Sequence, residues 1–161
     1  MELIRPATPD DVPTIAELIR GLAEYEHLAD QVVLDDARLR AHLFGPRKFA
    51  EVLLAEEGGE VVGFALFFYN YSTFLGQPGI YLEDIFVRPE KRGRGHGKAL
   101  LAALARLAVE NDCGRIEWSV LDWNAPSIAF YRSLGAVSKD EWTTYRLTGA
   151  AIAALAATDA A

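Results

Sequence analysis

The chain has 161 residues, of which 51% are hydrophobic and 24% are charged. This length predicts one domain, and the composition is that of a folded globular protein rather than of a disordered chain. The net charge of −7 disfavours a nucleic-acid partner, which prefers a basic surface. It mildly favours a small cationic ligand, although many folded proteins are acidic simply for solubility.

Cysteine content and apolar segments bear on the compartment. Cys113 is the single cysteine, so an intrachain disulfide cannot form and a reducing compartment is expected. No stretch resembles a signal peptide, and none approaches the ~18–20 apolar residues of a membrane span. We therefore expect a cytoplasmic protein without a membrane partner. The three histidines lack zinc-site spacing, so no metal is expected.

Two helices are expected near the N-terminus. Apolar residues recur at helical spacing after Thr8 and Asp11, which resemble a capping box, and this pattern predicts a helix over residues 9–25. A shorter helix is expected over residues 35–43, because the Gly45-Pro46 pair stops it.

Runs of β-forming residues predict a sheet. The clearest hairpin joins residues 49–55 to residues 61–69 through a polar turn with two glycines. A loop is expected at residues 72–79. Further strands are expected at residues 2–5, 80–87, 115–121, 136–142 and 144–147.

Helical patterns return in the second half of the chain. Leucines at helical spacing predict a helix that ends near Asn111, and Gly135 ends a short helix expected over residues 126–134. The simplest architecture is a mixed α/β fold with helices on both faces of one sheet. We expect one domain over residues 1–148, followed by a short Ala-rich tail at 149–161.

A basic, glycine-rich turn lies between a predicted strand and a predicted helix, with the sequence Arg92-Gly93-Arg94-Gly95-His96-Gly97-Lys98. Glycines let the backbone approach a ligand closely, and the unpaired amides and dipole of a helix start favour an anion such as a diphosphate. The alternative is a basic turn with no ligand. The spacing matches neither a P-loop nor the dinucleotide fingerprint.

Read as Arg92-x-x-Gly95-x-Gly97, the turn resembles the pyrophosphate loop of the Gcn5-related N-acetyltransferase (GNAT) superfamily. Residues 121–136 resemble the downstream segment of that superfamily, with Asn124 as a helix cap and Pro126 in the first turn. Together with residues 80–89, the resemblance extends to diamine (spermidine/spermine) N-acetyltransferase and its thialysine-acetylating relatives, over residues 3–147.

This resemblance implies a GNAT-like fold with a mixed, mostly antiparallel sheet of six to seven strands. It also implies acetyl-CoA as the donor, a small-molecule primary amine as the acceptor, and a homodimer. Residues 120–124 look more like the thialysine branch than the polyamine branch, so both acceptor classes stay open. Two other functions also stay open: a non-catalytic acyl-CoA-binding module, and a protein or peptide N-acetyltransferase.

The resemblance also implies roles for single residues. Glu83 would take the amine proton through water, and Tyr131 would protonate the departing thiolate. Within a regular strand Glu83 and Asp84 point to opposite faces, so only one of them would line the site. Structural readings remain for both proposed catalytic groups: a salt-bridged strand acid for Glu83 and a core aromatic for Tyr131. The implied donor-binding residues are Ile85, Phe86, Val87, Arg92, Gly93, Arg94, Gly95, His96, Gly97, Lys98, Asn124, Ser127 and Tyr131, and the implied amine-binding residues are Tyr25, Glu26, Glu83, Glu117, Trp118 and Ser119.

Overall fold

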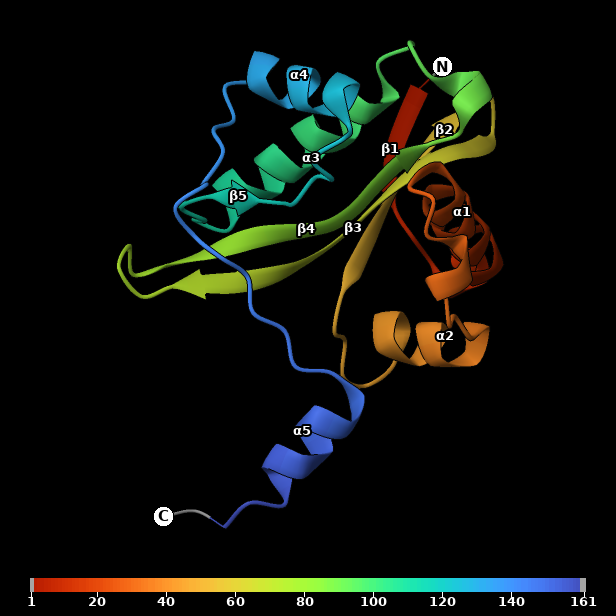
Figure 1. The fold of residues 1–161 in the computed structure, drawn as a ribbon. Coiled ribbons are helices and arrows are strands. Elements are labelled where there is room, and N and C mark those ends of the chain that lie inside the picture. The colour runs from red at the N-terminus through yellow and green to blue at the C-terminus, as the bar shows by residue number, and fades with distance from the viewer. Residues whose placement is uncertain (1, 160–161) are drawn as a thin grey trace. The chain divides into compact units, whose positions relative to one another are not determined.

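In the computed structural model, which describes residues 2–159, the strands form one sheet in the order β1-β2-β3-β4-β5 (Figure 1). Neighbouring strands are antiparallel except for β4 and β5, which are parallel. The expected mixed, mostly antiparallel sheet is thereby confirmed, with five strands in the described part of the chain instead of six or seven. The strands are β1 Glu2–Pro6, β2 Glu51–Glu57, β3 Glu60–Ser72, β4 Gln77–Val87 and β5 Ile116–Glu117.

The helices agree with the sequence pattern to within a few residues. Asp35 caps the second helix by accepting a hydrogen bond from the backbone N–H of Ala37 at 2.8 Å, and Gly45 follows its last residue. The helices are α1 Val12–Tyr25, α2 Asp36–Phe44, α3 His96–Glu110, α4 Ala125–Ser133 and α5 Gly149–Ala156, with single 3-10 turns η1 Pro9–Asp11, η2 Ala29–Gln31 and η3 Pro89–Lys91. None of the helices within residues 2–159 is long and apolar enough to span a membrane.

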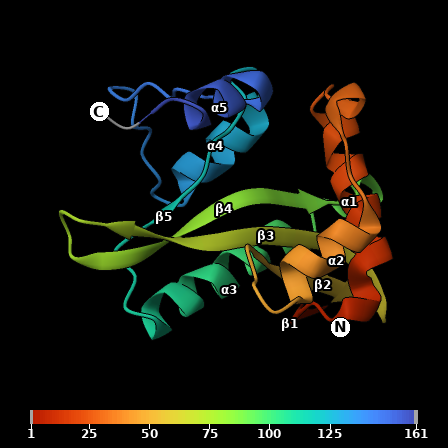
Figure 2. The same cartoon turned by 90° about the horizontal axis from the view of Figure 1, so that it is seen from below.

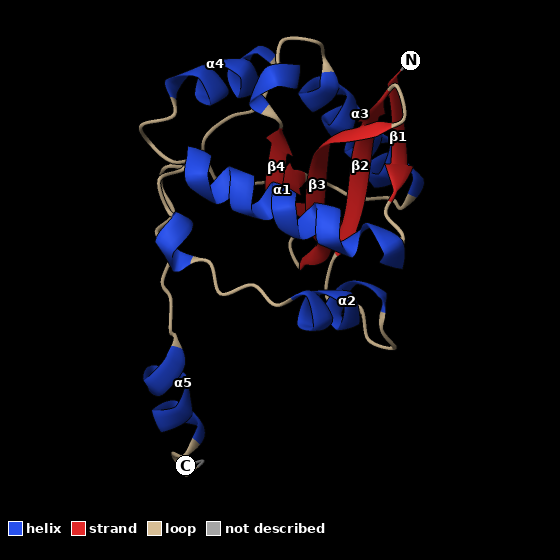
Figure 3. Ribbon diagram, turned by 90° about the vertical axis from the view of Figure 1, so that its right-hand side faces the viewer, coloured by secondary structure: helices blue, strands red, loops and turns tan. Residues whose placement is uncertain are grey.

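The chain divides into two compact units, one ending at Leu121 and the other starting at Asp122. The first unit contains the sheet with α1, α2 and α3, and the second contains α4 and α5. Within the first unit, α1 and α2 cover one face of the sheet and α3 covers the other (Figures 2 and 3). The expectation of one domain over residues 1–148 stays a prediction.

The core of the first unit is built on strands that are buried on both faces. Val52 to Ala55 of β2 and Val62 to Ala65 of β3 are consecutive buried residues, as expected for central strands between two helical layers. On the α1 face, Ile15, Leu18 and Phe86 belong to one apolar cluster. Burial of each such side chain stabilises the fold by about 1.5–3 kcal/mol, so this cluster fixes α1 against β4.

Two turns connect the long antiparallel strands. Gly58 and Gly59 have φ angles of 60° and 84°, which is the left-handed geometry of a two-residue hairpin turn. The turn expected over residues 56–60 is shorter in the structure, because residues 56 and 57 pair with residues 61 and 60. The loop expected at residues 72–79 is shorter in the structure, because residues 70–72 pair with residues 77–79 and extend both strands.

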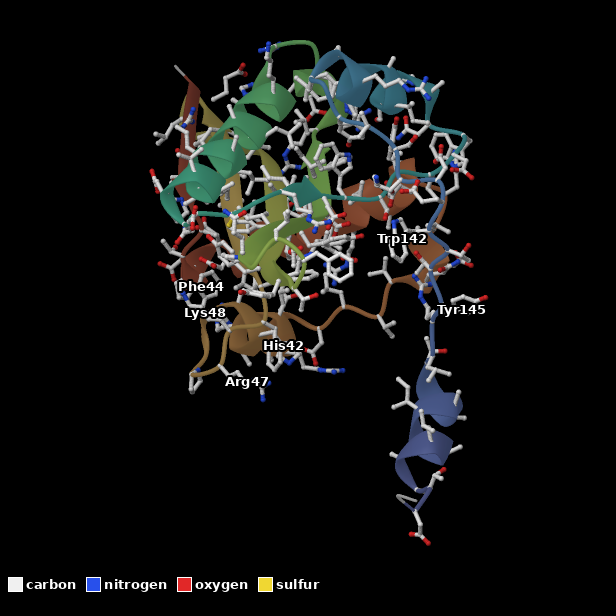
Figure 4. The ribbon with its side chains drawn as sticks, turned by 90° about the vertical axis from the view of Figure 1, so that its left-hand side faces the viewer. His42, Phe44, Arg47, Lys48, Trp142 and Tyr145 are labelled. Carbon is white, nitrogen blue, oxygen red and sulfur yellow. The ribbon has the colours of Figure 1, made fainter. Side chains whose placement is uncertain are left out.

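Three expected strands differ in the structure. The strand predicted over residues 115–121 is β5, which has only two residues, and residues 136–142 and 144–147 form no strand. A strand persists only where a neighbouring strand accepts and donates its backbone hydrogen bonds, and α4 and α5 offer none within the second unit. Trp142 and Tyr145 in this segment are 77% and 92% exposed (Figure 4). The strands expected over these two ranges are therefore absent from the described part of the chain.

Candidate functional site

A β-bulge in β4 places Glu83. Leu82 lies opposite Phe67 and Asp84 lies opposite Leu66, so Glu83 is an extra residue between two regular pairs. Residues directly opposite each other in an antiparallel pair share a face, and the neighbours Leu66 and Phe67 point to opposite faces. Leu82 and Asp84 therefore lie on opposite faces. The expectation that Glu83 and Asp84 point to opposite faces assumed a regular strand, and the bulge breaks that alternation at Glu83.

The bulge gathers negative charge near the C-terminal end of α1. Burial raises the pKa of Asp84 to about 6, and repulsion from Glu83 and Glu26 adds to this rise. Burial also raises the pKa of Glu26, which follows the last residue of α1. Glu83 itself is exposed. Three carboxyl groups from α1 and β4 thus face one region, where a cationic amine would relieve their mutual repulsion.

The C-terminal half of β4 has an open edge. β5 pairs with β4 at two positions, Ile80 with Ile116 and Tyr81 with Glu117. Within residues 2–159, no strand adjoins this side of β4 from Leu82 to Val87. The backbone groups along such an edge can pair with the amides of an extended ligand. Ile85, Phe86 and Val87, the expected pantetheine contacts, are the last residues of this segment.

The glycine-rich turn follows directly from this edge. Gly93 and Gly95 have φ angles of 77° and 88°, and Gly95 is the N-cap of α3. A Cβ added at Gly93, Gly95 or Gly97 would meet no atom within 4 Å. Glycine is therefore needed there for the left-handed backbone of the first two positions, and the space beside all three is open to a ligand. Lys98 is exposed in the first turn of α3, whereas His96 is buried.

Arg92 connects the turn to the expected amine side. Its guanidinium carbon lies 4.6 Å from the ring centroid of Tyr25 and 5.3 Å from that of Phe86. Its Nε donates a hydrogen bond to the backbone oxygen of Val87 at 2.9 Å. The structure thus brings together one residue expected to bind the donor and one expected to bind the amine.

The remaining amine-site candidates in the first unit, Glu117, Trp118 and Ser119, lie at the end of the short strand β5 and directly after it. The hydroxyls of Ser119 and Tyr81 are 3.1 Å apart and share a hydrogen bond. Glu117 lies 4.0 Å from the Arg115 guanidinium, at the outer limit of an ion pair. Trp118 lies between Glu117 and Ser119 in the sequence and is half-buried.

The second unit carries the other expected residues. Asn124 is buried and caps α4, because its side-chain oxygen accepts a hydrogen bond from the backbone N–H of Ser127 at 3.4 Å. Tyr131 lies on α4, half-buried, with its ring centroid 5.7 Å from that of Phe130. The predicted cap of α4 is thereby confirmed.

Comparison with known proteins decides the family. Residues 15–136 match the acetyltransferase (GNAT) family. The chain belongs to this family of acetyltransferases. A thialysine N-epsilon-acetyltransferase of Bos taurus is 41% identical over 96% of both chains. The human spermidine/spermine N(1)-acetyltransferase-like protein 1 is 33% identical over 89% of this chain and 22% of its own. The solved V. cholerae integron cassette protein VCH_CASS6 has a TM-score of 0.81 with 25% identity over 98% of each chain.

The family and the mixed GNAT fold expected from the sequence are confirmed by these matches and by the sheet. Residues of this acetyltransferase fit an acyl-CoA donor: an open strand edge for its amides leads into a glycine-rich turn for its diphosphate. Among the described residues, no group of three or more His, Cys, Asp or Glu side chains could hold a metal ion.

Two features of the site were missed in the sequence. Only one of Glu83 and Asp84 was expected to line the site, and the bulge that interrupts the strand between Leu82 and Asp84 is visible only in the register with β3. Glu57 binds side chains of the glycine-rich turn, although it lies more than thirty residues before that turn. The only sign of this role in the sequence is that Glu57 directly precedes the Gly58-Gly59 turn, and this position does not reveal which side chains lie near it.

Proposed function

We propose that this acetyltransferase transfers the acetyl group of acetyl-CoA to a primary amine of a small molecule. The acceptor is a lysine-like amino acid such as thialysine, or a polyamine. The observation that carries the proposal is one continuous arrangement within the first unit. The open edge of β4 runs into the glycine-rich turn, and three carboxyl groups gather at the bulge of the same strand.

The donor supplies an activated acyl thioester when it is bound. Backbone N–H groups near Phe86 and Val87 orient its carbonyl and pantetheine part, and the amides at the start of α3 receive the diphosphate. Contacts to the diphosphate and pantetheine are far from the acetyl carbon that reacts, but they still restrict the position of that carbon. The residues proposed for the donor are Ile85, Phe86, Val87, Arg92, Gly93, Arg94, Gly95, His96, Gly97, Lys98, Asn124, Ser127 and Tyr131.

The amine must lose a proton before it attacks, because a primary ammonium has a pKa of about 10. Glu83 is exposed at the bulge, where it accepts this proton through a water molecule. Glu26 and Asp84 hold the ammonium beforehand by charge attraction, and Tyr25 forms the wall next to them. Glu117, Trp118 and Ser119 complete the proposed amine site.

Tyr131 is assigned the second proton transfer on the basis of the family resemblance. Its phenol donates a proton to the departing thiolate, so that the reaction ends with a neutral thiol and an amide. The same resemblance supports a homodimer and a cytoplasmic location.

A thiol-release assay with a panel of amines tests the proposal. Acetyl-CoA is mixed with thialysine, lysine, spermidine, spermine, putrescine and a peptide that has a free N-terminus. We expect turnover with the free amines and a higher kcat/KM for them than for the peptide. CoA binding without any turnover would identify a non-catalytic acyl-CoA-binding module, and a preference for the peptide would assign the protein to the protein acetyltransferases.

A further inference from the structure

One carboxylate outside the expected site binds Lys91, which immediately precedes the glycine-rich turn, and the side chains of Arg94 and His96 within the turn. Glu57 is the last residue of β2, and its side chain is 24% exposed. Its oxygens accept hydrogen bonds from Lys91 Nζ at 2.8 Å and from Arg94 Nη1 at 2.9 and 3.1 Å. The Nε2 atom of His96 lies 3.3 Å from the same carboxylate. Hydrogen bonds from Lys91 and Arg94 are the main reason why the pKa of Glu57 falls to about 2, so this carboxylate is ionised throughout the neutral range.

The three partners are spread along the chain from Lys91, just before the turn, to His96, the first residue of α3. Between them lie Gly93 and Gly95, which have no side chains and no atom within 4 Å of the position that a Cβ would take. Other residues therefore do not pack against the side of these glycines on which a Cβ would lie. The contacts to one half-buried carboxylate supply an external support for the turn.

We infer that Glu57 is a positioning residue for the donor: it holds the turn at residues 91–96 in the conformation that receives the diphosphate. The inference rests on the proposed use of acetyl-CoA. Glu57 need not touch the donor itself, because it acts through Lys91, Arg94 and His96. A turn that is already ordered does not lose conformational entropy when the diphosphate binds.

Simple charge attraction predicts the opposite effect of removing this carboxylate. Loss of a negative charge makes the turn more positive, and a diphosphate would then bind more tightly. The cationic side chains of Arg92, Arg94 and Lys98 in the turn are exposed, however, and solvent and salt screen such charges strongly. Ordering a glycine-containing turn of several residues opposes binding by more than one screened charge favours it. The sign of the effect therefore separates the two explanations.

The test compares Glu57→Gln with Glu60→Gln, which removes the same charge from the other side of the Gly-Gly turn. Two donors are used, acetyl-CoA and acetyl-pantetheine, and the second lacks the diphosphate. For Glu57→Gln we expect the KM for acetyl-CoA to rise about tenfold, equivalent to a loss of ~1.4 kcal/mol in binding. The kcat, the KM for the amine and the kcat/KM with acetyl-pantetheine should not change. Glu60→Gln should match the wild type in every measurement.

Two results would overturn the inference. A lower KM for acetyl-CoA in Glu57→Gln would mean that the carboxylate competes with the diphosphate. An equal loss with both donors would mean a general structural role. If Glu57→Gln does not fold, as judged by thermal unfolding, Glu57→Asp keeps the charge but draws the carboxylate back from Lys91, Arg94 and His96. It should raise the KM for acetyl-CoA alone by about threefold, and an unchanged KM would count against the inference.

Failure of the proposed function can be distinguished from failure of the inference about Glu57. A wild-type protein that binds CoA but acetylates no amine would contradict the proposed function. In that case Glu57→Gln is compared with the wild type by calorimetry with CoA and with pantetheine. A selective loss of CoA affinity would then still support the role of Glu57.

Discussion

Glu83 is exposed at the bulge of β4, in the position proposed for the group that removes the amine proton. We predict that Glu83→Gln lowers kcat at neutral pH and that activity recovers as the pH approaches 10. At high pH more of the amine is already neutral, so the missing base matters less. The measurement is a profile of kcat/KM against pH for wild type and variant with one amine.

The matched control for this profile is Glu110→Gln, an exposed acid at the end of α3. Its profile should follow that of the wild type. A constant ratio between Glu83→Gln and wild type from pH 6 to pH 10 would remove Glu83 from the proton transfer.

Asp84 shares the bulge with Glu83 but is half-buried, and its pKa is about 6 instead of the ordinary 3.8. Between these two values the folded chain keeps a proton that the unfolded chain has released. The free energy of unfolding therefore falls as the pH rises through this window. We predict that Asp84→Asn is more stable than the wild type at pH 7, by up to about 3 kcal/mol, and that the difference nearly vanishes below pH 4. Urea unfolding across this pH range measures both values.

Glu24→Gln is the control for Asp84→Asn, because it removes an exposed acid from α1. It should change the stability by less than about 0.5 kcal/mol at every pH. If Asp84→Asn gives the same stability difference at pH 4 and at pH 7, the buried carboxyl is not the cause.

At the level of elements, an ion-pair network joins β1 to the start of α1. Arg5 donates hydrogen bonds to Asp11 at 2.8 and 3.0 Å, and the backbone N–H of Thr8 donates to the same carboxylate at 2.7 Å. The Arg5 guanidinium is the main reason why the pKa of Asp11 falls to about 2. This stabilisation is present above pH 3.8 and is lost as the pH falls through 2.

We therefore predict that Asp11→Asn lowers the free energy of unfolding by about 1–2 kcal/mol at pH 7. The difference from the wild type should shrink as the pH approaches 2. Its sign is opposite to that of Asp84→Asn, which is expected to be more stable than the wild type. Asp10→Asn is the matched control, because the neighbouring carboxylate is exposed. Equal losses in the two variants at pH 7 would show that helix-end charge, and not the network with Arg5, stabilises this junction.

Elements whose cause is local were predictable from the sequence. The helix α1 follows from its apolar spacing, α2 from its cap at Asp35 and its stop at Gly45, and the β2–β3 hairpin from its two glycines. The same holds for the glycine-rich turn, because the left-handed backbone at Gly93 and Gly95 needs glycine itself.

Features that depend on a distant strand could not be predicted. The bulge at Glu83 exists because of its register with Leu66 and Phe67, which no local pattern encodes. The shortness of β5 also depends on a distant strand, because β5 extends only as far as it pairs with Ile80 and Tyr81 of β4. Both departures lie at the proposed site, where they open the edge of β4 and gather the acids.

At the level of the whole molecule, the uneven distribution of charge fits the two proposed ligands. The net charge is −7, yet four cationic side chains lie within residues 91–98. An anionic donor and a cationic amine are thus each met by the opposite charge on different elements of the first unit. Within that unit, Arg92 stacked on Tyr25 joins the two regions physically.

Exposed apolar side chains in the second unit bear on the proposed homodimer. Trp142 and Tyr145 are 77% and 92% exposed on a segment that was expected to form strands and that has no strand partner among residues 2–159 (Figure 4). A second copy of the chain would supply both the hydrogen-bonding partner and the apolar cover. We predict a mass in solution of twice the 17.7 kDa of one chain, measured by light scattering after size exclusion.

The variant that tests this source of dimerisation is Trp142→Ser combined with Tyr145→Ser. Removal of two aromatic contacts should weaken the dimer by at least about tenfold, so that dilution yields monomer. The control is Phe74→Ser, which removes a fully exposed aromatic from the β3–β4 turn and should leave the dimer intact. If Phe74→Ser dissociates the dimer and the double variant does not, the dimer contact lies at the β3–β4 turn and not at Trp142 and Tyr145. A monomeric wild type would contradict the homodimer itself.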